Sequence, residues 1–436
     1  MKRAKQYLIV TIAVLSFAAC GKNEKENPPP TQPEVSITGT YELHTGEPLS
    51  TLTLTGTATC DGQAVAGAFS WKDGATTYRA AGQYDAPWVF TPADAGKYAP
   101  AEGTVKVTVD LSVTWELLTS DFYGLRDFSG RDMSNNGMAM NMLDNGMIEY
   151  RMFTRLRNTG ATIPLALVPE ENIYAILNSD VMINDPSNVR IDWRQLTPFK
   201  GEYVACADTF NTWENRGKLF RAADPYFFWD RADYFTFVHR ILGVKNASLS
   251  AIVQENGKYV FARTSDLHTW ETGREVPDDF PRDGGFARLP GEDASRPLLL
   301  VGGVNGPNYR NLKYLNTVWR SSDGLTWEKI ASTQPPFPEG MAGASLVEYG
   351  GTLYLIGGRN EAEQPSKSIV CSSDGGVSWQ PAGKAMELPA EYKARAYASV
   401  FVTPDNTFLI FSGIADFQPV NPPCLLEIWE GRIGGW

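Results

Sequence analysis

Four short phrases, each ending in a tryptophan, recur along the chain and constrain its fold more than any other feature. The tryptophans are Trp213, Trp270, Trp327 and Trp379, and they follow one another at intervals of 57, 57 and 52 residues. Self-similarity at such a period indicates stacked or circular repeats, because one repeat cannot bury its hydrophobic face alone. A repeat architecture is therefore predicted for most of the chain.

The repeat unit has the pattern of four short strands. In the best preserved copy the first three strands are expected at 341–347, 352–356 and 369–372, and the fourth begins at Trp379. Neighbouring units supply further apolar runs at 297–301, 318–321, 408–411 and 426–429. Four strands in about 55 residues are typical of a propeller blade.

The number of blades follows from the markers and the space before them. Trp436 lies 57 residues after Trp379 and marks a fifth unit. Strands expected at 150–157 and 173–177 would supply one more, so six blades are predicted, with seven as the competing count. Residues 135–145 are rich in methionine and asparagine and are interpreted as a long loop and a possible lid.

The aspartate of each phrase is interpreted as a turn residue. Its carboxylate can accept hydrogen bonds from backbone N–H groups of a tight hairpin, and a glycine such as Gly376 permits positive φ there. A structural role is therefore predicted for the aspartates and serine, with the tryptophans packing between sheets. The residues assigned this structural role are Ser372, Asp374, Gly376, Trp379, Asp323, Trp327, Trp270 and Trp213.

The first residues have the pattern of an export signal. Lys2, Arg3 and Lys5 precede an apolar stretch too short to span a bilayer comfortably, and small residues directly precede Cys20. This ending resembles a bacterial lipobox, which implies that Cys20 is lipidated and becomes the new N-terminus. An ordinary secretory signal is the alternative. The polar, proline-rich residues 21–33 are expected to form a disordered tether.

Residues 34 to about 115 have the pattern of short strands separated by turns. Strands are expected at 49–60, 68–71, 88–92 and 103–109, with a turn at Asp61 and Gly62. Together these phrases resemble the Ig-like sandwich repeats of bacterial surface proteins, in which Trp71 and Trp88 would be core aromatics. Such a domain implies a spacer on a cell surface.

The repeat region resembles two groups of propellers. Apolar strands ending in Gly302-Gly303 and Gly357-Gly358 are similar to those of kelch and galactose-oxidase-like propellers, and Ser372–Trp379 matches the Asp-box of sialidase-like propellers. With its lipobox, the whole chain resembles uncharacterised surface lipoproteins of Bacteroides-type bacteria. The sequence thus predicts an all-β chain with a leader at 1–19, a tether at 20–33, an Ig-like sandwich at 34–115 and a propeller at 116–436.

Composition excludes several classes of function. The formal net charge is −11, or −14 once the three basic leader residues are removed, so a nucleic-acid partner is not expected. The three histidines do not cluster and the five cysteines have no metal-like spacing, so neither a metal nor another cofactor is expected. Cys60 and Cys206 are predicted to be buried free thiols, while a bridge between Cys371 and Cys424 stays open.

Ligands of propellers commonly meet loops at one end of the central channel. The loops after Gly303, Gly358 and Gly413 are the candidates here, and an aromatic segment around residue 229 joins them because aromatic rings beside charged groups suit a sugar. The candidate ligand-binding residues are Asn305, Tyr309, Arg310, Arg359, Asn360, Asp416 and Trp229. For Trp229, burial at a blade edge is an equally weighted alternative.

These observations favour a membrane-tethered envelope lipoprotein of the outer membrane, facing either the cell surface or the periplasm. Its propeller would bind a glycan or a protein, and no catalysis is expected. A sialidase-like glycoside hydrolase is the first alternative; it would need converging arginines such as Arg310, Arg359 and Arg395. A purely structural envelope protein is the second alternative.

Overall fold

A computed structural model gives the fold. It describes residues 29–120, 133–142, 148–156, 162–168, 173–176, 182–184, 195–207, 217–223, 228–233, 237–289, 293, 295–306, 311–417, 425 and 427–434. The side chains of residues 133–184, Phe228 and Asp233 lie outside this description. The leader, Cys20, Trp213, Tyr309, Arg310, Cys424 and Trp436 also lie outside it, so predictions on them stay predictions.

The described residues are almost entirely β, joined by turns and by short 3-10 helices such as η1 (Leu49–Thr51) and η6 (Lys384–Met386). No helix among them is long and apolar enough to cross a membrane. The chain divides into two compact units. One contains residues 1–40, 53–74 and 85–105, and the other contains 41–52, 75–84 and 106–436.

The N-terminal strands form two sheets. The first has the order β1-β3-β4 and the second β2-β7-β6-β5. Trp71 on β5 lies opposite Trp88 on β6, and Trp88 is buried, as expected of a core aromatic. The strand bounds are β1 Glu34–Thr38, β2 Glu42–His44, β3 Thr55–Cys60, β4 Gln63–Ala64, β5 Gly67–Trp71, β6 Gly82–Pro92 and β7 Ala101–Asp110. The expected strand at 49–60 therefore begins only at Thr55, because Leu49–Thr51 forms η1.

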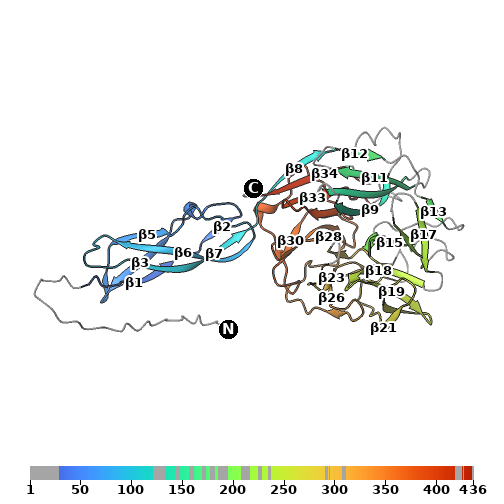
Figure 1. Cartoon of the computed structure of the whole chain (residues 1–436), viewed down its shortest axis with the longest axis horizontal. Helices are drawn as coiled ribbons and strands as arrows, with labels where there is room; N and C mark the ends of the chain where they lie inside the picture. Colours follow the sequence, from blue (N-terminus) through green and yellow to red (C-terminus); the bar gives the residue numbers. More distant parts are fainter. Residues whose placement is uncertain are drawn as a thin grey trace, which may run out of the picture. The chain divides into compact units, whose positions relative to one another are not determined.

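The rest of the chain is a β-propeller, whose sheets follow one another around a ring (Figure 1). Among the described residues six sheets of four or five strands make up this ring, and the count of six blades, with seven as the competitor, stays a prediction. The sheet orders are β12-β11-β10-β9, β13-β17-β16-β15-β14, β18-β19-β20-β21, β22-β23-β26-β27, β28-β29-β30-β31 and β32-β33-β34-β8.

The strand bounds of the first three sheets are β9 Met133–Met142, β10 Ile148–Leu156, β11 Thr162–Val168, β12 Ile173–Ile176, β13 Met182–Asn184, β14 Thr197–Phe199, β15 Glu202–Cys206, β16 Leu219–Ala222, β17 Phe228–Asp233, β18 Phe237–Lys245, β19 Ser248–Glu255, β20 Lys258–Thr264 and β21 Glu271–Glu275. Those of the others, with the β24-β25 pair, are β22 Ala287–Arg288, β23 Leu298–Val301, β24 Val304–Asn305, β25 Lys313–Tyr314, β26 Val318–Ser321, β27 Glu328–Lys329, β28 Ala342–Tyr349, β29 Thr352–Arg359, β30 Ile369–Ser372, β31 Gln380–Pro381, β32 Ser399–Val402, β33 Thr407–Phe411, β34 Ile428–Ile433 and β8 Val113–Thr119.

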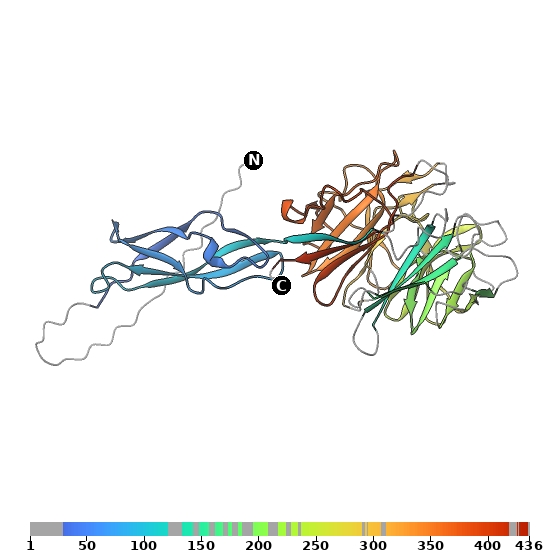
Figure 2. The same ribbon diagram turned by 90° about the horizontal axis from the view of Figure 1, so that it is seen from above.

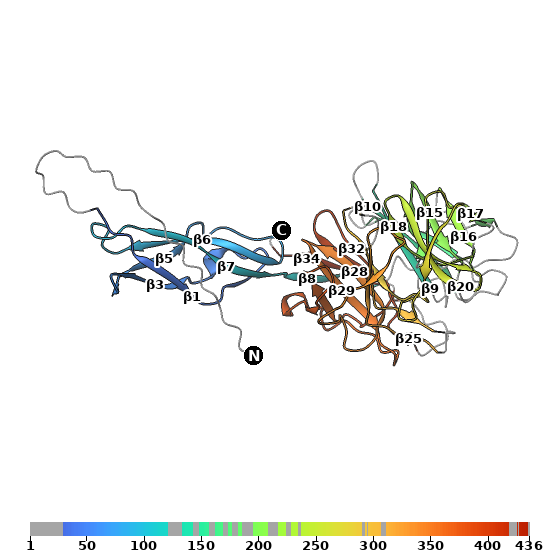
Figure 3. The same cartoon turned by 90° about the horizontal axis from the view of Figure 1, so that it is seen from below.

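The ring is closed by strands from opposite ends of the propeller sequence. The strand β34 pairs antiparallel with β33 on one side and with β8 on the other. Figures 2 and 3 show β8 running alongside β34. The last sheet is therefore complete only when the segment before the propeller contributes its strand.

Buried tryptophans fill the spaces between neighbouring sheets. Trp327 is fully buried among Leu242, Ile252 and Phe261 of the preceding sheet and Trp319 of its own. Trp379 packs against Leu299 and other residues of the β22–β27 sheet and against its own sheet. Burying aromatic area in this way is a main source of stability for such folds. Trp327 and Trp379 thus pack between neighbouring sheets.

The prediction of a long loop at residues 135–145 is wrong for most of that segment. Met133–Met142 form β9, which pairs with β10 over almost its whole length. Met138, Met140 and Met142 alternate with Ala139 and Asn141. Period two is the signature of a strand, and the asparagines obscured it.

Candidate ligand-binding site

The clearest gathering of functional side chains surrounds Arg359, the last residue of β29. Its guanidinium carbon lies 4.3 Å from the ring centroid of Phe417, 5.7 Å from that of Tyr397 and 5.8 Å from that of Tyr314. We refer to these four residues, with Glu363, as the Arg359 cluster. Tyr314 ends β25, whereas Tyr397 precedes β32 and Phe417 follows β33 of one and the same sheet, so segments before and after the sheet of Arg359 supply the rings.

The hydrogen-bonding capacity of Arg359 is incompletely used. Arg359 Nη1 lies 3.2 Å from Glu363 Oε1, while Nε is buried and has no hydrogen-bond partner among the residues that the structure describes. The side chain is 14% exposed. A guanidinium carries five N–H donors in a planar fork, and buried donors are nearly always paired in proteins. The described residues therefore use only part of the hydrogen-bonding capacity of this guanidinium.

Glycines bring these loops into contact. Gly343 has a φ of 71°, and a Cβ on it would lie 3.0 Å from the ring of Tyr397. The backbone N–H of Tyr397 donates to Gly343 O at 2.6 Å, and that of Gly343 donates to Gly285 O at 2.7 Å. A larger residue at 343 would be strained and would also push Tyr397 away. The cluster is therefore positioned by backbone contacts between three sheets.

The three rings are half-buried. Burial raises the pKa of Tyr314 to about 12, so its phenol stays protonated at any physiological pH. A protonated phenol both donates and accepts hydrogen bonds. The cluster thus combines apolar ring faces, a cation, a carboxylate and hydroxyl groups within a small space.

A second group of polar side chains lies at residues that the sequence did not single out. His239 Nε2 lies 3.2 Å from Asp283 Oδ1, and the His239 ring lies 4.6 Å from that of Tyr259. Burial lowers the pKa of His239, so the imidazole is neutral at pH 7. Although burial opposes ionisation of Asp283, hydrogen bonds from His239 and from the N–H of Gly306 keep its pKa below the ordinary value. Among the described residues no set of three potential ligands could hold a metal ion.

Two of the predicted loop residues have structural roles. Asn305 is buried, donates through Nδ2 to Asp278 O at 2.5 Å, and leaves Oδ1 buried without a partner. Asn360 Oδ1 accepts from the N–H of Gln364 at 3.0 Å and stabilises the turn that carries Glu363. Asp416 is exposed next to Phe417. Of the predicted residues, Arg359 alone lies at the centre of the cluster.

Trp229 is not an exposed platform for a ligand, which corrects its place among the candidates. It is fully buried, with 0% exposure. The strand β17 lies between β13 and β16, and Trp229 faces Ile183 across the parallel pair with β13. A central strand buries its large apolar side chains, so the alternative of burial was the correct one.

Arg395 is likewise not available for an arginine cluster. Its side chain is fully buried and pairs through Nη2 with Glu427. Its Nε donates to Lys393 O at 2.9 Å and its Nη1 to Ser412 O at 3.0 Å. The guanidinium also stacks on Tyr392 at 4.1 Å. All three nitrogens are thus occupied, in contrast to those of Arg359.

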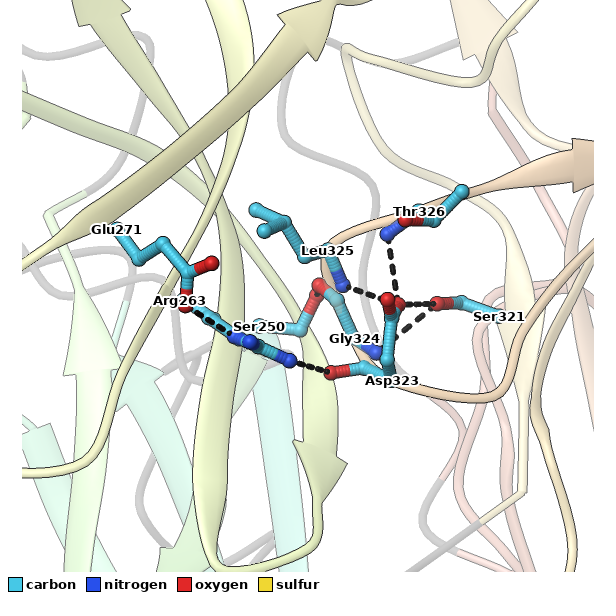
Figure 4. A network of polar contacts seen from close by, with 8 residues as sticks. All are labelled: Ser250, Arg263, Glu271, Ser321, Asp323, Gly324, Leu325 and Thr326. Carbon is cyan, nitrogen blue, oxygen red and sulfur yellow. Dashed lines mark hydrogen bonds and ion pairs between the residues drawn. The ribbon is translucent and has the colours of Figure 1, made fainter.

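The repeated aspartates act on hairpins. Asp323 Oδ1 accepts from the N–H groups of Leu325 and Thr326 at 2.8 and 2.7 Å (Figure 4). Ser321 Oγ in turn accepts from the N–H of Gly324 at 2.9 Å. In the same way, Asp374 Oδ1 accepts hydrogen bonds from the N–H groups of Val377 and Ser378. Asp266 Oδ1 accepts from those of His268 and Thr269. These are the hydrogen bonds of a turn-stabilising aspartate.

Side chains from preceding parts of the chain also donate hydrogen bonds to the backbone of these hairpins. Arg263 Nη1 on β20 donates to Asp323 O at 3.1 Å and pairs with Glu271, and Ser250 Oγ on β19 donates to Gly324 O (Figure 4). At the next hairpin Ser332 Oγ donates to Val377 O at 2.8 Å. At the hairpin that contains Asp266, Lys200 Nζ donates to Ser265 O at 2.7 Å. The hairpins are therefore joints between sheets rather than parts of a reaction centre.

Replacing Asp374 with alanine should lower the free energy of unfolding at pH 7 by about 1 kcal/mol, because a solvent-facing turn loses its capping hydrogen bonds. The Asp374 pKa lies below its ordinary value through hydrogen bonds from Ser378, Ser372 and Val377, although burial opposes this. The stabilisation is therefore complete above about pH 4 and declines as pH falls towards the folded-state pKa. Urea unfolding at pH 7 and pH 3 measures both effects.

The matched control is Glu255→Ala, which removes an exposed carboxylate at the end of β19. We expect it to change stability by less than about 0.5 kcal/mol. If Asp374→Ala lost no more stability than this control at pH 7, or if its deficit persisted unchanged at pH 3, the role assigned to the carboxylate would be wrong.

One family model agrees with this fold. The family model for the "DUF6242 beta propeller domain" matches residues 184–436, which is more than half of the chain. Among solved structures, "Structure of YjhT" aligns with 14% sequence identity and a TM-score of 0.45, covering 70% of this chain and 98% of that one. No curated protein matches the chain. The family match, together with the ring of sheets, shows that this chain belongs to the family of the DUF6242 β-propeller domain.

Proposed function

We propose that the propeller is a binding module and that it binds a glycan at the Arg359 cluster. The observation that carries this proposal is the arrangement of one under-used guanidinium among three half-buried aromatic rings. Aromatic faces pack against the apolar face of a sugar ring, while a few placed polar groups fix its orientation. Arg359, Glu363 and the tyrosine hydroxyls are suited to the sugar hydroxyls.

The alternatives receive less support. A sialidase-like site needs several arginines on one substrate carboxylate, but Arg395 is fully buried and all of its nitrogens are engaged elsewhere. A purely structural role predicts loop ends poor in aromatic residues, whereas the Arg359 cluster gathers three rings there. Binding of a ligand at the Arg359 cluster is therefore the function that we propose.

The binding experiment is a panel of neutral and acidic oligosaccharides presented to the purified full chain, with hits measured by calorimetry. Saturable binding of at least one glycan supports the proposal. An empty panel combined with a specific protein recovered from envelope extracts would replace the glycan with a protein partner. If both were empty, the propeller would not be a binding module of either kind.

We further propose that lipid on Cys20 tethers the protein to the outer membrane, at the cell surface or on the periplasmic side. This rests on the small residues before Cys20 and on the polar tail that follows. A Cys20→Ala variant is expected to lose a lipid-sized mass increment and to leave the membrane fraction. Cys60→Ala serves as the control and should keep both properties. Unchanged membrane association of Cys20→Ala would contradict the tether.

A further inference from the structure

A second arginine near the Arg359 cluster stacks on an aromatic ring. The guanidinium carbon of Arg282 lies 4.8 Å from the ring centroid of Tyr259. Its Nε is buried without a hydrogen-bond partner, and its side chain is 19% exposed. Arg282 therefore repeats the two features that distinguish Arg359: stacking on an aromatic ring and a donor without an acceptor.

The neighbouring carboxylate does not satisfy this arginine. Asp283 Oδ2 lies 3.7 Å from Arg282 Nε, which is too long for a hydrogen bond. The same carboxylate is already engaged by His239 Nε2 at 3.2 Å and by the N–H of Gly306 at 2.8 Å. Asp283 is thus held in place by other groups, and Arg282 keeps unused capacity for an anion.

Arg282 lies on the same loop as Gly285, which approaches Tyr397 of the Arg359 cluster. Arg282 precedes Gly285 by three residues, a distance that an extended chain covers in about 10 Å. The Tyr397 hydroxyl lies 3.5 Å from the position that a Cβ on Gly285 would occupy. The positive φ of 64° at Gly285 and the hydrogen bond from Gly343 N–H to its carbonyl fix this approach. A single ligand of several units could therefore reach both arginines.

From this geometry we infer that Arg282 is a second anion-binding position, so that the ligand of the propeller is an oligosaccharide carrying carboxylate groups on more than one unit. The inference rests on the proposed glycan-binding function and specifies its ligand. A planar guanidinium matches the two oxygens of a carboxylate, and a stacked arginine loses less freedom on binding. The chain as a whole is acidic, with a net charge of −11, so such a ligand must be recognised by local arginines rather than by general attraction.

The test uses the full chain and three probes: tetragalacturonate, its fully methyl-esterified form, and galacturonate monomer. The tetramer should bind more tightly than the monomer, and methyl esterification should weaken its binding at least tenfold. Arg282→Ala should weaken tetramer binding about tenfold, which is the size of one charge-assisted contact, and leave monomer binding unchanged. The affinity of Arg282→Lys for the tetramer should lie between that of Arg282→Ala and that of the wild type, because the charge remains but the planar fork is lost.

Arg320→Ala is the matched control, because Arg320 pairs with exposed Glu328 on β26 and β27, away from both clusters. It should bind the tetramer like the wild type. Circular dichroism checks that each variant is folded. Equal binding of the esterified tetramer, or an unchanged affinity of folded Arg282→Ala, would overturn the second position while leaving glycan binding intact. Failure of the wild type to bind any glycan of the wider panel would instead reject the proposed function itself.

Discussion

Replacing Arg359 with alanine is expected to weaken glycan binding by at least about 30-fold, equivalent to about 2 kcal/mol, the loss typical of a central binding residue. Arg359 occupies the middle of its cluster, within 6 Å of all three ring centroids. Its removal takes away the charged donors and also the flat guanidinium surface that lies against the rings. The measurement is calorimetric titration of the best glycan from the panel.

Two further variants make this result interpretable. Phe417→Leu keeps an apolar side chain but removes the aromatic face nearest to the guanidinium, and it should produce a smaller loss than Arg359→Ala. Arg320→Ala removes an exposed arginine of the same propeller and should bind normally. Should folded Arg359→Ala retain wild-type affinity, the glycan site would have to be sought elsewhere.

Replacing Arg395 with alanine is expected to destabilise the fold by about 3–5 kcal/mol, because a buried Glu427 would lose its counter-charge. Arg395 also donates hydrogen bonds to the carbonyls of Lys393 and Ser412, and these two bonds would be lost. Trp429 Nε1 donates to the same Glu427 carboxylate at 3.0 Å, so the damage should extend into the last sheet. Urea unfolding followed by tryptophan fluorescence measures the loss.

An exposed ion pair of the same sheet provides the comparison. Arg432 pairs with Glu430 at 2.7 Å, and its side chain is 65% exposed. Arg432→Ala should cost less than about 1 kcal/mol, the usual value of a surface ion pair. Equal losses for the two variants would show that burial of the Arg395 pair has no special importance. A double replacement, Arg395→Met with Glu427→Leu, should recover part of the stability because no charge is left buried and unpaired.

The fold was largely predictable because its signals are local and periodic. Apolar strands ending in glycine pairs, and tryptophans at a nearly constant interval, recur in each unit, so the blade strands at 352–356, 369–372 and 408–411 were found within a few residues. The strand β9 was missed because its polar residues are asparagines, which ordinarily favour turns. The pairing with β10 overrides that preference.

The site was predictable only in part, for a physical reason. The position of Arg359 after Gly357-Gly358 placed it at a loop end, but its ring partners come from other sheets and meet it through the closure of the propeller. The burial of Trp229 and of Arg395 depends on strand order and on Glu427, neither of which has a sequence signature. Arg282 and His239 lie in segments without any motif, and their interest arises from Tyr259 and Asp283 across the fold.

The pairing of β8 with β34 has a consequence for folding during synthesis. During synthesis β8 emerges before β9, whereas its partner β34 is made only after β33. Until then β8 and, later, β33 present unpaired strand edges that could join another chain. Long-range pairing of this kind also folds slowly. Nascent chains would therefore benefit from a factor that covers those edges until β34 is made and pairs with β8.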